Sequence, residues 1–343
     1  MKKLNVLALV HESLVPPESI EGLAENEVAP FKTEYDVIST LRRMGHQVQP
    51  VGVCSDLRVI RTAVESMHPN IVFNLLEEFD GQAVFDQNVV GYLELLGLPY
   101  SGCGPRGLML ARDKALAKQL LAYHRIRVPD FVVFRRGATV RRPRRLTFPL
   151  FVKSLIEEAS LGIAQASIVN DDQALQERVT FIHERIQTDA IVEQYIDGRE
   201  LYVGVLGNHR MRVLPVWELL FTKAPEEMPR IATARAKWDF KYQQRWGIIS
   251  KAAEDLPEGM PARIAALAKR IYRCLGLTGY ARIDMRMTPA GELFVLEANP
   301  NPQLAYGEDF AESAHAAGLN YERLLQRILN LGLSRARELR TTA

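Results

Sequence analysis

The stretch Gly279–Pro302, with the sequence GYARIDMRMTPAGELFVLEANPNP, contains two alternating runs on either side of a turn. Residues two apart in a strand lie on the same face. The first run therefore has an apolar face and a charged face, with Ile283, Met285 and Met287 opposite Arg282, Asp284 and Arg286. The second run separates Phe294, Leu296 and Ala298 from Glu297 and Asn299. Because TPAG between the runs is typical of a turn, we predict an antiparallel β-hairpin.

The register of this hairpin decides what its polar face can do. A turn of two residues at 290–291, or of four placed symmetrically, pairs Asp284 with Glu297 and Arg282 with Asn299. Like charges directly opposite each other destabilise a sheet, so the pair makes sense with a cation between the carboxylates. Carboxylate and amide oxygens suit Mg²⁺, which takes only one or two carboxylates from protein and completes its shell with phosphates and water. A turn of three or five residues would spoil this register and favour a hairpin whose polar face simply meets water.

Composition indicates a folded protein of two or three domains, with no overall attraction to nucleic acid or membranes. The chain has 343 residues, of which 47% are hydrophobic and 24% charged, and its formal net charge is +2. We expect no nucleic-acid partner, because the one strongly basic stretch, Arg135–Arg145, has no interleaved aromatic residues. We expect no membrane span, because no apolar run approaches ~20 residues. Three dispersed cysteines and no recognisable signal peptide favour a cytoplasmic location.

The order of the predicted elements indicates an α/β fold that becomes α+β in the later part of the chain. The first hundred residues alternate strands with helices, which predicts a parallel sheet covered on both faces. The predicted strands are 5–10, 46–53 and 70–76, and the predicted helices are 33–44, 55–67 and 83–96. Beyond a single helix at 107–124 the strands become antiparallel, and 222–250 reads as a polar loop. We place domains at 1–105, 106–197 and 198–343.

The hairpin sequence RIDMRMTPAGELFVLEANPNP resembles the metal-binding hairpin of the ATP-grasp superfamily, and specifically of the D-alanine:D-alanine ligase family. The resemblance implies an ATP-grasp fold with an N-terminal Rossmann-like parallel αβ domain. It implies ATP and Mg²⁺ as cofactors, with Mn²⁺ as an alternative ion. It makes Asp284, Glu297 and Asn299 the metal ligands, Arg282 a catalytic stabiliser of the phosphoryl group, and Leu296 part of the ATP pocket.

Further segments resemble the same family, in order, along roughly residues 90 to 330. In LARDKALAKQLL the resemblance places Lys114 on the nucleotide phosphates. In FPLFVKSLIEEASLGI it places Lys153 on the α/β phosphates and the backbone from Ser160 to Gly162 over the β/γ end. In VEQYIDGREL it assigns the adenine edge and the ribose to these residues: Glu193, Gln194, Tyr195, Ile196 and Glu200. KWDFKYQQRWGI resembles the lid, where Lys241 is our choice for the transferring phosphate and Tyr242 closes the pocket; Lys237 and Lys223 are less favoured substitutes.

The positions that handle substrates in the family differ here. His11, Glu12 and Ser13 stand where the family has a glycine pair, and NLLEEFDGQAVFD replaces its His-Gly stretch. A loop serine of the family is Ala159, and NPNPQLAYGED introduces Gln303 and Glu308 near the substrate carboxylate. Glu25 in AENEV resembles a contact to the first substrate's amino group, Tyr242 and Gln303 are further substrate candidates, and Glu308 is a candidate for reading a cationic amine. The positions that bind the nucleotide in the family are kept here, whereas those that bind the substrates are altered. This difference favours a substrate pair other than two D-alanines.

The combined expectation is an ATP- and Mg²⁺-dependent carboxylate–amine ligase that acts through an acyl-phosphate. One alternative is a true D-alanine:D-alanine ligase, which fast phosphate release and dipeptide formation from D-alanine would establish. A second is a non-catalytic ATP-binding regulatory protein, which would bind ATP without turnover. A third, a small-molecule binder of the periplasmic type, rests on the N-terminal αβ pattern alone and leaves the hairpin unexplained. The family also implies a homodimer through the first domain.

Overall fold

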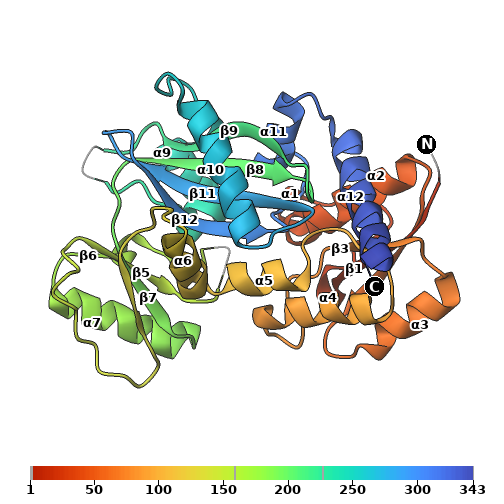
Figure 1. Cartoon of the computed structure of the whole chain (residues 1–343), viewed down its shortest axis with the longest axis horizontal. Helices are drawn as coiled ribbons and strands as arrows, with labels where there is room; N and C mark the ends of the chain where they lie inside the picture. The colour runs from red at the N-terminus through yellow and green to blue at the C-terminus, as the bar shows by residue number, and fades with distance from the viewer. Residues whose placement is uncertain (1–2, 158–159, 226–227, 343) are drawn as a thin grey trace.

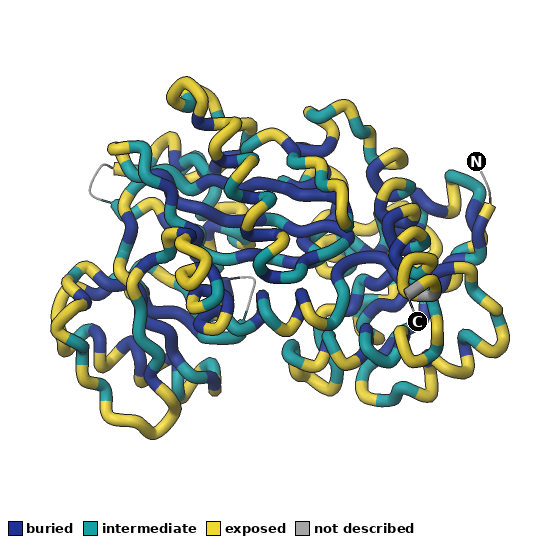
Figure 2. The backbone as a smooth tube through the Cα atoms, in the orientation of Figure 1, coloured by how far each residue is buried: buried dark blue, intermediate teal, exposed yellow. Residues whose placement is uncertain are grey.

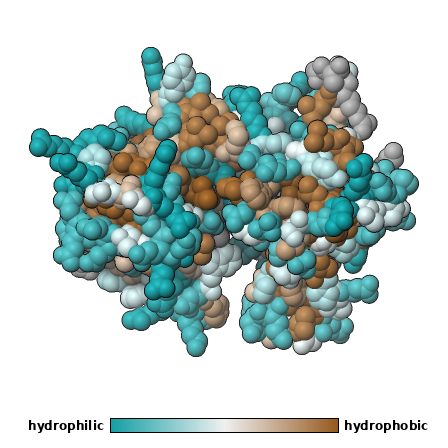
Figure 3. Space-filling model, turned by 90° about the horizontal axis from the view of Figure 1, so that it is seen from below, coloured by the Kyte–Doolittle hydropathy of each residue, from teal (hydrophilic) through white to brown (hydrophobic). Residues whose placement is uncertain are grey.

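The computed structural model describes residues 3–157, 160–225 and 228–342, which form three β-sheets in order along the chain. Figure 1 shows the largest sheet in the middle, the smaller antiparallel sheet at the lower left and the parallel sheet at the right, near both termini. Viewed from below in Figure 3, a notch separates two lobes, and hydrophobic side chains gather towards the centre of this face. In the described part of the chain, no helix is long and apolar enough to span a membrane.

The parallel sheet matches the prediction from the first hundred residues. It has the strand order β2-β1-β3, with β1 at Asn5–His11, β2 at Gln47–Val53 and β3 at Ile71–Asn74. The side chains of β1 alternate between one hydrophobic cluster on one face of the sheet and two clusters on the other face. Helices α3 (Arg58–Met67) and α4 (Asp86–Leu95) contribute to one cluster, and α2 (Lys32–Arg43) and α12 (Tyr321–Thr342) lie on the opposite side. A strand buried on both faces reads as a continuous apolar run, as VLALV does.

The small antiparallel sheet has one apolar face and one face that carries charges. Its order is β4-β7-β5-β6, with β4 at Phe131–Phe134, β5 at Leu150–Ser154, β6 at Ile168–Val169 and β7 at Ala190–Gln194. Leu150, Val152 and Val192 pack with α7 (Asp172–Phe181) in one core. The period of two therefore turns Lys153 and Glu193 to the other face, towards the large sheet.

The large sheet has the order β10-β9-β8-β11-β12, with every neighbouring pair antiparallel. Its strands are β8 (Arg199–Leu206), β9 (Arg212–Phe221), β10 (Ile248–Ala252), β11 (Tyr280–Met287) and β12 (Leu293–Pro300). Ile283 and Met285 lie in the core with Ile264 and Ala268 of α10 (Met260–Cys274), as the alternation of β11 predicts. The strands of this sheet are largely buried in Figure 2. One face is thus closed by α10, part of the other packs against α11 (Asp309–Ala316), and the rest of that face is turned to the small sheet.

The hairpin of β11 and β12 reaches the predicted pairing by an unpredicted route. Met287 pairs with Leu293, which leaves a five-residue turn, 288–292. The ladder then shifts by one residue between Asp284 and Met285, because Leu296 is an extra residue in β12. This β-bulge cancels the odd turn, so Asp284 still lies opposite Glu297 and Arg282 opposite Asn299. A five-residue turn therefore does not spoil the register.

The bulge also corrects the predicted faces of β12. Before it, Leu293 and Val295 are buried in the core, and after it Ala298 is. Phe294 lies opposite Arg286, on the charged face, instead of sharing a face with Ala298. One inserted residue reverses the in–out alternation, which explains why parity predicted the side chains correctly only beyond Leu296.

Other differences from the predicted elements are local. The expected helix at 107–124 is two helices, α5 (Pro105–Arg112) and α6 (Lys114–Tyr123), because Asp113 leaves the helical conformation and its carboxylate accepts hydrogen bonds from the backbone of residues 115 and 116. The polar loop at 222–250 contains α8 (Ala234–Trp238), α9 (Phe240–Trp246) and β10. The remaining helices include α1 (Glu25–Val28) and α11 (Asp309–Ala316).

A buried carboxyl on α2 should make the stability of the protein depend on pH. Burial raises the pKa of Glu34 from 4.5 to about 7, and a hydrogen bond with its own backbone lowers it to a smaller extent. The unfolded chain releases this proton first, so this group lowers the free energy of unfolding as pH rises from about 4.5 to about 7. Glu34→Gln should therefore raise the melting temperature more at pH 8 than at pH 5, by a difference on the order of 2 kcal/mol in unfolding free energy.

Thermal unfolding of both proteins at the two pH values measures this difference. The exposed Glu258 supplies a matched control, since Glu258→Gln should shift the melting temperature equally at both pH values. An equal shift for Glu34→Gln at pH 5 and pH 8 would contradict the burial argument.

Candidate active site

A cavity of about 70 Å³ lies between the small and the large sheet. It is lined by residues of both sheets and of the loops above them: Phe151, Lys153, Ser160, Ile163, Glu193, Gln194, Tyr195, Ile196, Glu200, Tyr202, Ile231, Ala232, Lys237, Asp284, Arg286, Leu296 and Glu297. Most of the residues predicted to hold ATP and metal thus meet in one place. Ligand pockets for small molecules measure ~300 to 1,000 Å³, so this cavity alone is too small for a nucleotide; a cavity of about 690 Å³ shares Tyr195 and Glu200 with it.

The cavity is narrow because two loops contact each other above it. The Ser160 hydroxyl donates a hydrogen bond to the Ala232 carbonyl at 2.7 Å. The backbone N–H of Ala234 donates to the Ile163 carbonyl at 3.2 Å. These bonds join the loop after β5 to the segment that precedes α8. The first segment was predicted to cover the phosphates and the second leads into the predicted lid, so their contact defines a closed arrangement above the cavity.

The polar face of the hairpin carries one ion pair that is complete within the protein. Arg282 donates to both carboxylate oxygens of Asp284, at 2.8 Å each, and the side-chain amide of Asn299 donates to Asp284 at 3.0 Å. The guanidinium also lies over the ring of Tyr202, 4.6 Å from its centroid. Burial raises the pKa of Asp284, and Arg282 offsets part of this effect. Arg282 is therefore fixed on the face that would meet a phosphoryl group.

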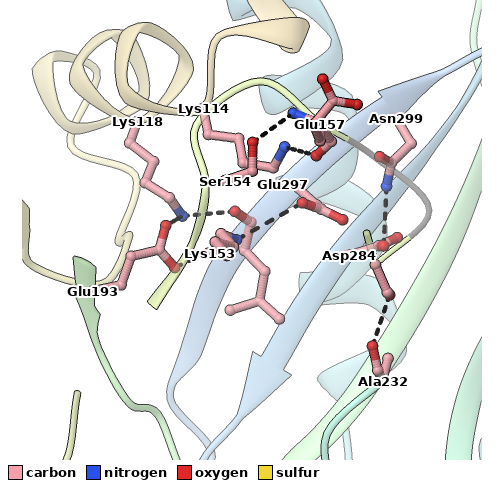
Figure 4. A network of polar contacts seen from close by, with 12 residues as sticks. Lys114, Lys118, Lys153, Ser154, Glu157, Glu193, Ala232, Asp284, Glu297 and Asn299 are labelled. Carbon is pink, nitrogen blue, oxygen red and sulfur yellow. Dashed lines mark hydrogen bonds and ion pairs between the residues drawn. The ribbon is translucent and has the colours of Figure 1, made fainter. Parts of the chain in front are cut away.

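Four charged residues of alternating sign connect the two sheets beside this pair, as Figure 4 shows. Lys118 Nζ lies 3.3 Å from one oxygen of Glu193, whose other oxygen lies 3.5 Å from Lys153 Nζ. Lys153 in turn lies 3.8 Å from Glu297. The first three side chains are almost fully buried, and that of Glu297 is 27% exposed. Glu297 is thus the end of the series that a ligand can reach.

Neighbouring charges set the ionisation of this series. Burial alone would raise the pKa of Glu297, but Lys153, Lys114 and Lys237 outweigh it and lower that pKa to about 2. Burial opposes the charge on Lys153 as well, yet Glu193 and Glu297 together raise its pKa. Glu297 is therefore a carboxylate at neutral pH, facing cations on one side and Asp284 across the ladder.

Arg286 is a residue of the site that the sequence reasoning did not single out. It donates to Glu200 at 2.8 Å, to the Ile196 carbonyl at 3.1 Å and to the Arg230 carbonyl. Tyr202 donates a second hydrogen bond to Glu200, at 3.0 Å. Glu200, predicted to accept from ribose hydroxyls, is thus already oriented by two donors. The signal was present in the alternation of β11, which places Arg286 on the face of Arg282 and Asp284.

Two predicted nucleotide residues lie beside the cavity instead of in its wall. Lys114, at the start of α6, donates to the Glu157 carbonyl at 2.5 Å and so holds the loop after β5. Gly162 has a φ of +72°, and its carbonyl accepts a hydrogen bond from Arg178. A Cβ at this position would lie 2.9 Å from Ile186, so the loop needs glycine here. Ala159 lies outside the described residues.

The predicted substrate residues do not line the cavity. Glu25 is exposed at the first turn of α1, and Gln303 is half-buried after β12. Glu308 immediately precedes α11, and burial raises its pKa, with Asp309 adding to the rise and Lys32, Arg282 and Lys237 opposing it. Glu308 therefore lies within electrostatic reach of Arg282.

The end of β1 forms a separate hydrogen-bonded group. His11 Nδ1 lies 2.7 Å from the Ser13 hydroxyl, and His11 Nε2 lies 3.4 Å from Glu78.

The donor set on the hairpin fits a magnesium ion that arrives with phosphates. Among the residues that the structure describes, no three His, Cys, Asp or Glu side chains lie together to hold a metal unaided. The directly opposed carboxylates of Asp284 and Glu297, with Asn299 next to them, supply a partial shell of hard oxygen donors. Such a shell suits Mg²⁺, which needs other oxygens to complete it.

Comparisons with known proteins show the family to which the chain belongs. A family model described as D-ala D-ala ligase C-terminus matches residues 120–330. A D-alanine–D-alanine ligase of Desulforudis audaxviator is 32% identical over 318 residues, which cover 91% of this chain and 96% of that protein. This chain belongs to the D-alanine–D-alanine ligase family. An uncharacterized protein of Sinorhizobium fredii is also 32% identical, over 311 residues that cover 86% of this chain and 85% of that one.

The fold of the D-alanine–D-alanine ligase family extends over the whole chain. The crystal structure of D-alanine–D-alanine ligase from Bacillus anthracis complexed with ATP superposes with a TM-score of 0.75, covering 98% of this chain and 99% of that one at 22% identity. The predicted ATP-grasp fold, with a parallel αβ part and antiparallel sheets, is therefore confirmed. Members of this family are ATP-dependent ligases, so the prediction of an enzyme of this class is confirmed as well.

The structure places the lid residues of this ligase family member differently from the prediction. Lys241 is exposed on α9 and does not line the described cavity, whereas Lys237 of α8 does. Tyr242 packs within the lid, against Trp246 and under Arg235, instead of closing the cavity. Asp239 caps α9 through the Tyr242 backbone and so separates the two helices that carry Lys237 and Lys241. We therefore propose Lys237 in place of Lys241 as the lid residue that reaches the transferring phosphate.

Two matched substitutions test this choice. Lys237→Met should lower kcat for ATP-dependent phosphate release by about 10²-fold or more, because one donor to developing charge is lost. Lys241→Met should stay within about twofold, since its side chain points to solvent. Steady-state kinetics of both variants, with melting temperatures as a check of folding, measure the difference. The reverse ranking would return the role to Lys241.

Proposed function

We propose that the protein is a D-alanine–D-alanine ligase, which joins two D-alanine molecules with the hydrolysis of ATP to ADP and phosphate. Relatives with that name align along nearly the whole chain, at 32% and 31% identity for those of Desulforudis audaxviator and Oleidesulfovibrio alaskensis. A likeness of this extent includes the regions that would bind both substrates. The likeness supports D-alanine as both substrates over the different substrate pair that the altered motifs favour.

The observation that carries the proposal is the register of the hairpin. It brings Asp284, Glu297 and Asn299 together with Arg282 on one face of the hairpin, and Asp284 and Glu297 of this group line the cavity. The small sheet adds Lys153 opposite Glu297. A site with paired carboxylates and fixed cations between two sheets is suited to a nucleoside triphosphate and its counterion. The proposed reaction requires no side-chain nucleophile in this site.

In the proposed reaction a substrate carboxylate attacks the γ-phosphorus and the bond to ADP breaks. Asp284, Glu297 and Asn299 would hold Mg²⁺, which would supply positive charge to offset that of the phosphates. Arg282 would stabilise the equatorial oxygens from the position in which Asp284 holds it. Lys153 and Lys237 would pair with the phosphate chain from the small sheet and the lid.

The second half of the reaction forms the new bond. The amine of the second substrate attacks the acyl carbon of the acyl-phosphate, and inorganic phosphate leaves. Water competes with the amine at this stage, so the contact between the two loops above the cavity has a chemical purpose. The bond from Ser160 to Ala232 would help to keep water away from the phosphates.

The remaining assignments belong to the same proposal. The three sheets support domains at 1–105, 106–197 and 198–343. A cytoplasmic location suits an enzyme that consumes ATP, and a homodimer through the first domain follows from the resemblance to the family.

The experiment that tests the function is incubation with D-alanine, ATP and Mg²⁺. Expected products are ADP, phosphate and D-alanyl-D-alanine in equal amounts, detected by coupled phosphate release and by chromatography. Glu297→Gln serves as the inactive control. Binding of ATP with no phosphate release for any amine and carboxylate would instead support the non-catalytic regulatory protein.

One observation favours a second candidate, a ligase whose amine substrate is cationic. Glu308 is half-buried and lies within electrostatic reach of Arg282 and Lys237, close to the proposed reacting groups. A carboxylate there would repel the carboxylate of an amino acid and attract an additional ammonium group. Under this candidate a diamine or a cationic amino-acid derivative would replace the second D-alanine.

Glu308→Gln separates the two candidates. If the amine is cationic, the variant should lose about tenfold to a hundredfold in kcat/KM for that amine, because a hydrogen bond to a charged group contributes ~1.5 to 3 kcal/mol. If the second substrate is D-alanine, the same change should leave kcat/KM equal or higher, since a nearby negative charge is removed. Initial rates with D-alanine and with a panel of diamines measure both outcomes.

A further inference from the structure

Lys118 is a buried cation of the site to which the proposed reaction gives no task. It lies on α6, only 2% exposed, and burial lowers its pKa to about 8. Its Nζ donates to the Leu296 carbonyl at 2.6 Å and lies 3.4 Å from the Val295 carbonyl. It also lies 3.3 Å from Glu193. Figure 4 shows its side chain descending from the helix to these groups, at the side of the site away from Asp284.

The two carbonyls belong to the bulge that corrects the register of the hairpin. Leu296 is the extra residue of β12, and Val295 precedes it. A bulged residue is left out of the regular ladder, and a buried carbonyl without a donor is unfavourable. Lys118 supplies that donor from outside the sheet. The Val295 backbone N–H finds its own partner in the Arg127 carbonyl at 3.0 Å.

The bulge decides on which face Glu297 and Asn299 lie. With a five-residue turn and no bulge, the two strands would be offset by one residue where Asp284 meets its partner. A shift by one residue moves every side chain of a strand to the opposite face. Glu297 and Asn299 would then point into the core behind the sheet, and Ala298 would face the cavity. The position of the metal ligands therefore depends on a bulge for which Lys118 is the side-chain donor.

Lys118 also shares Glu193 with Lys153. Glu193 is 2% exposed and lies between the two ammonium groups. With Lys118 present, each lysine lies beside one oxygen of the Glu193 carboxylate, and Lys153 can also approach Glu297. Without Lys118, Glu193 would draw Lys153 away from the phosphate side of the cavity, because buried charges need close partners.

We infer that Lys118 is a positioning residue for the nucleotide–metal site, which holds the Leu296 bulge and thereby the register that presents Glu297 and Asn299. The inference rests on the proposed function in one respect, namely that these two side chains bind the Mg²⁺ that accompanies the nucleotide. Lys118 touches neither ligand in this arrangement and acts through the backbone of β12.

The test compares nucleotide binding with and without Mg²⁺ in Lys118→Met, which keeps the length of the side chain and removes its charge. Calorimetry with the non-hydrolysable analogue AMP-PNP gives Kd in Mg²⁺ buffer and in EDTA for the full-length protein. The ratio of the Kd in EDTA to the Kd in Mg²⁺ measures how much the metal ion strengthens binding, and therefore how well the hairpin presents its metal ligands. We expect this ratio to fall about tenfold to a hundredfold, as for other groups that orient metal ligands.

Arg335 supplies a matched control of the same kind. It is a buried cation that donates to backbone carbonyls, those of Gly102 at 2.6 Å and Tyr100 at 3.1 Å, away from the cavity. Arg335→Met should lower the melting temperature but leave the Mg²⁺ ratio at the wild-type value. If Lys118→Met does not fold, Lys118→Gln, which retains a single amide donor group, should show a smaller fall in the same ratio.

An unchanged ratio in a folded Lys118 variant would overturn the inference, whatever its melting temperature, because the lysine would then be only structural. A wild-type protein whose AMP-PNP affinity ignores Mg²⁺ would overturn the assignment of the metal ligands, and the inference with it. The first result would be seen only in the Lys118 variant and the second in the wild-type protein, so the two can be distinguished.

Discussion

The active site depends on one local constraint, the extra residue in β12. The turn of the hairpin has an odd number of residues, and the bulge at Leu296 is what restores direct pairing of Asp284 with Glu297. A bulge interrupts the ladder and exposes backbone groups that must be satisfied elsewhere. Here the satisfying donor is a buried lysine on α6, and the price of that arrangement is a cation taken out of water. The geometry of the proposed metal ligands is thus maintained by a residue of α6.

The same lysine begins a series of buried charges that joins α6, the small sheet and the large sheet. Lys118, Glu193, Lys153 and Glu297 alternate in sign, and each approaches the next within 4 Å. Buried ion pairs add little to stability compared with apolar packing, because desolvation opposes them. Their value in this protein is positional, since each charge limits where its neighbours can lie. A polyanionic ligand that enters beside Glu297 would meet cations already directed towards it.

The sequence was most informative where a pattern repeats and least informative where a single residue breaks it. Alternation along β11 predicted that Arg282 and Asp284 share a polar face, and the apolar run of β1 predicted a strand buried on both sides. A two-residue turn and a five-residue turn with a bulge give the same pairing of Asp284, so parity alone could not separate them. The misassigned face of Phe294 follows from that ambiguity.

Residues in irregular segments were harder to place for a related reason. Lys237 and Lys241 are four residues apart in a stretch read as loop, and only the cap at Asp239 turns one into the cavity and the other to solvent. Arg286 and Lys118 were visible as charges on predicted elements, but their partners come from other parts of the chain. Long-range pairing of this kind is a property of the packed sheets and is not written in local spacing.

Glu200 shows how the closed cavity and nucleotide binding are connected. Both of its carboxylate oxygens are engaged, one by Arg286 and one by Tyr202. An ionised carboxylate accepts about four hydrogen bonds in all, so it can accept from ribose hydroxyls while it keeps these donors. Arg286 also bonds the Arg230 carbonyl, which leads into the loop that meets Ser160. The segment before the lid and Glu200, the proposed ribose acceptor, are therefore held by the same arginine.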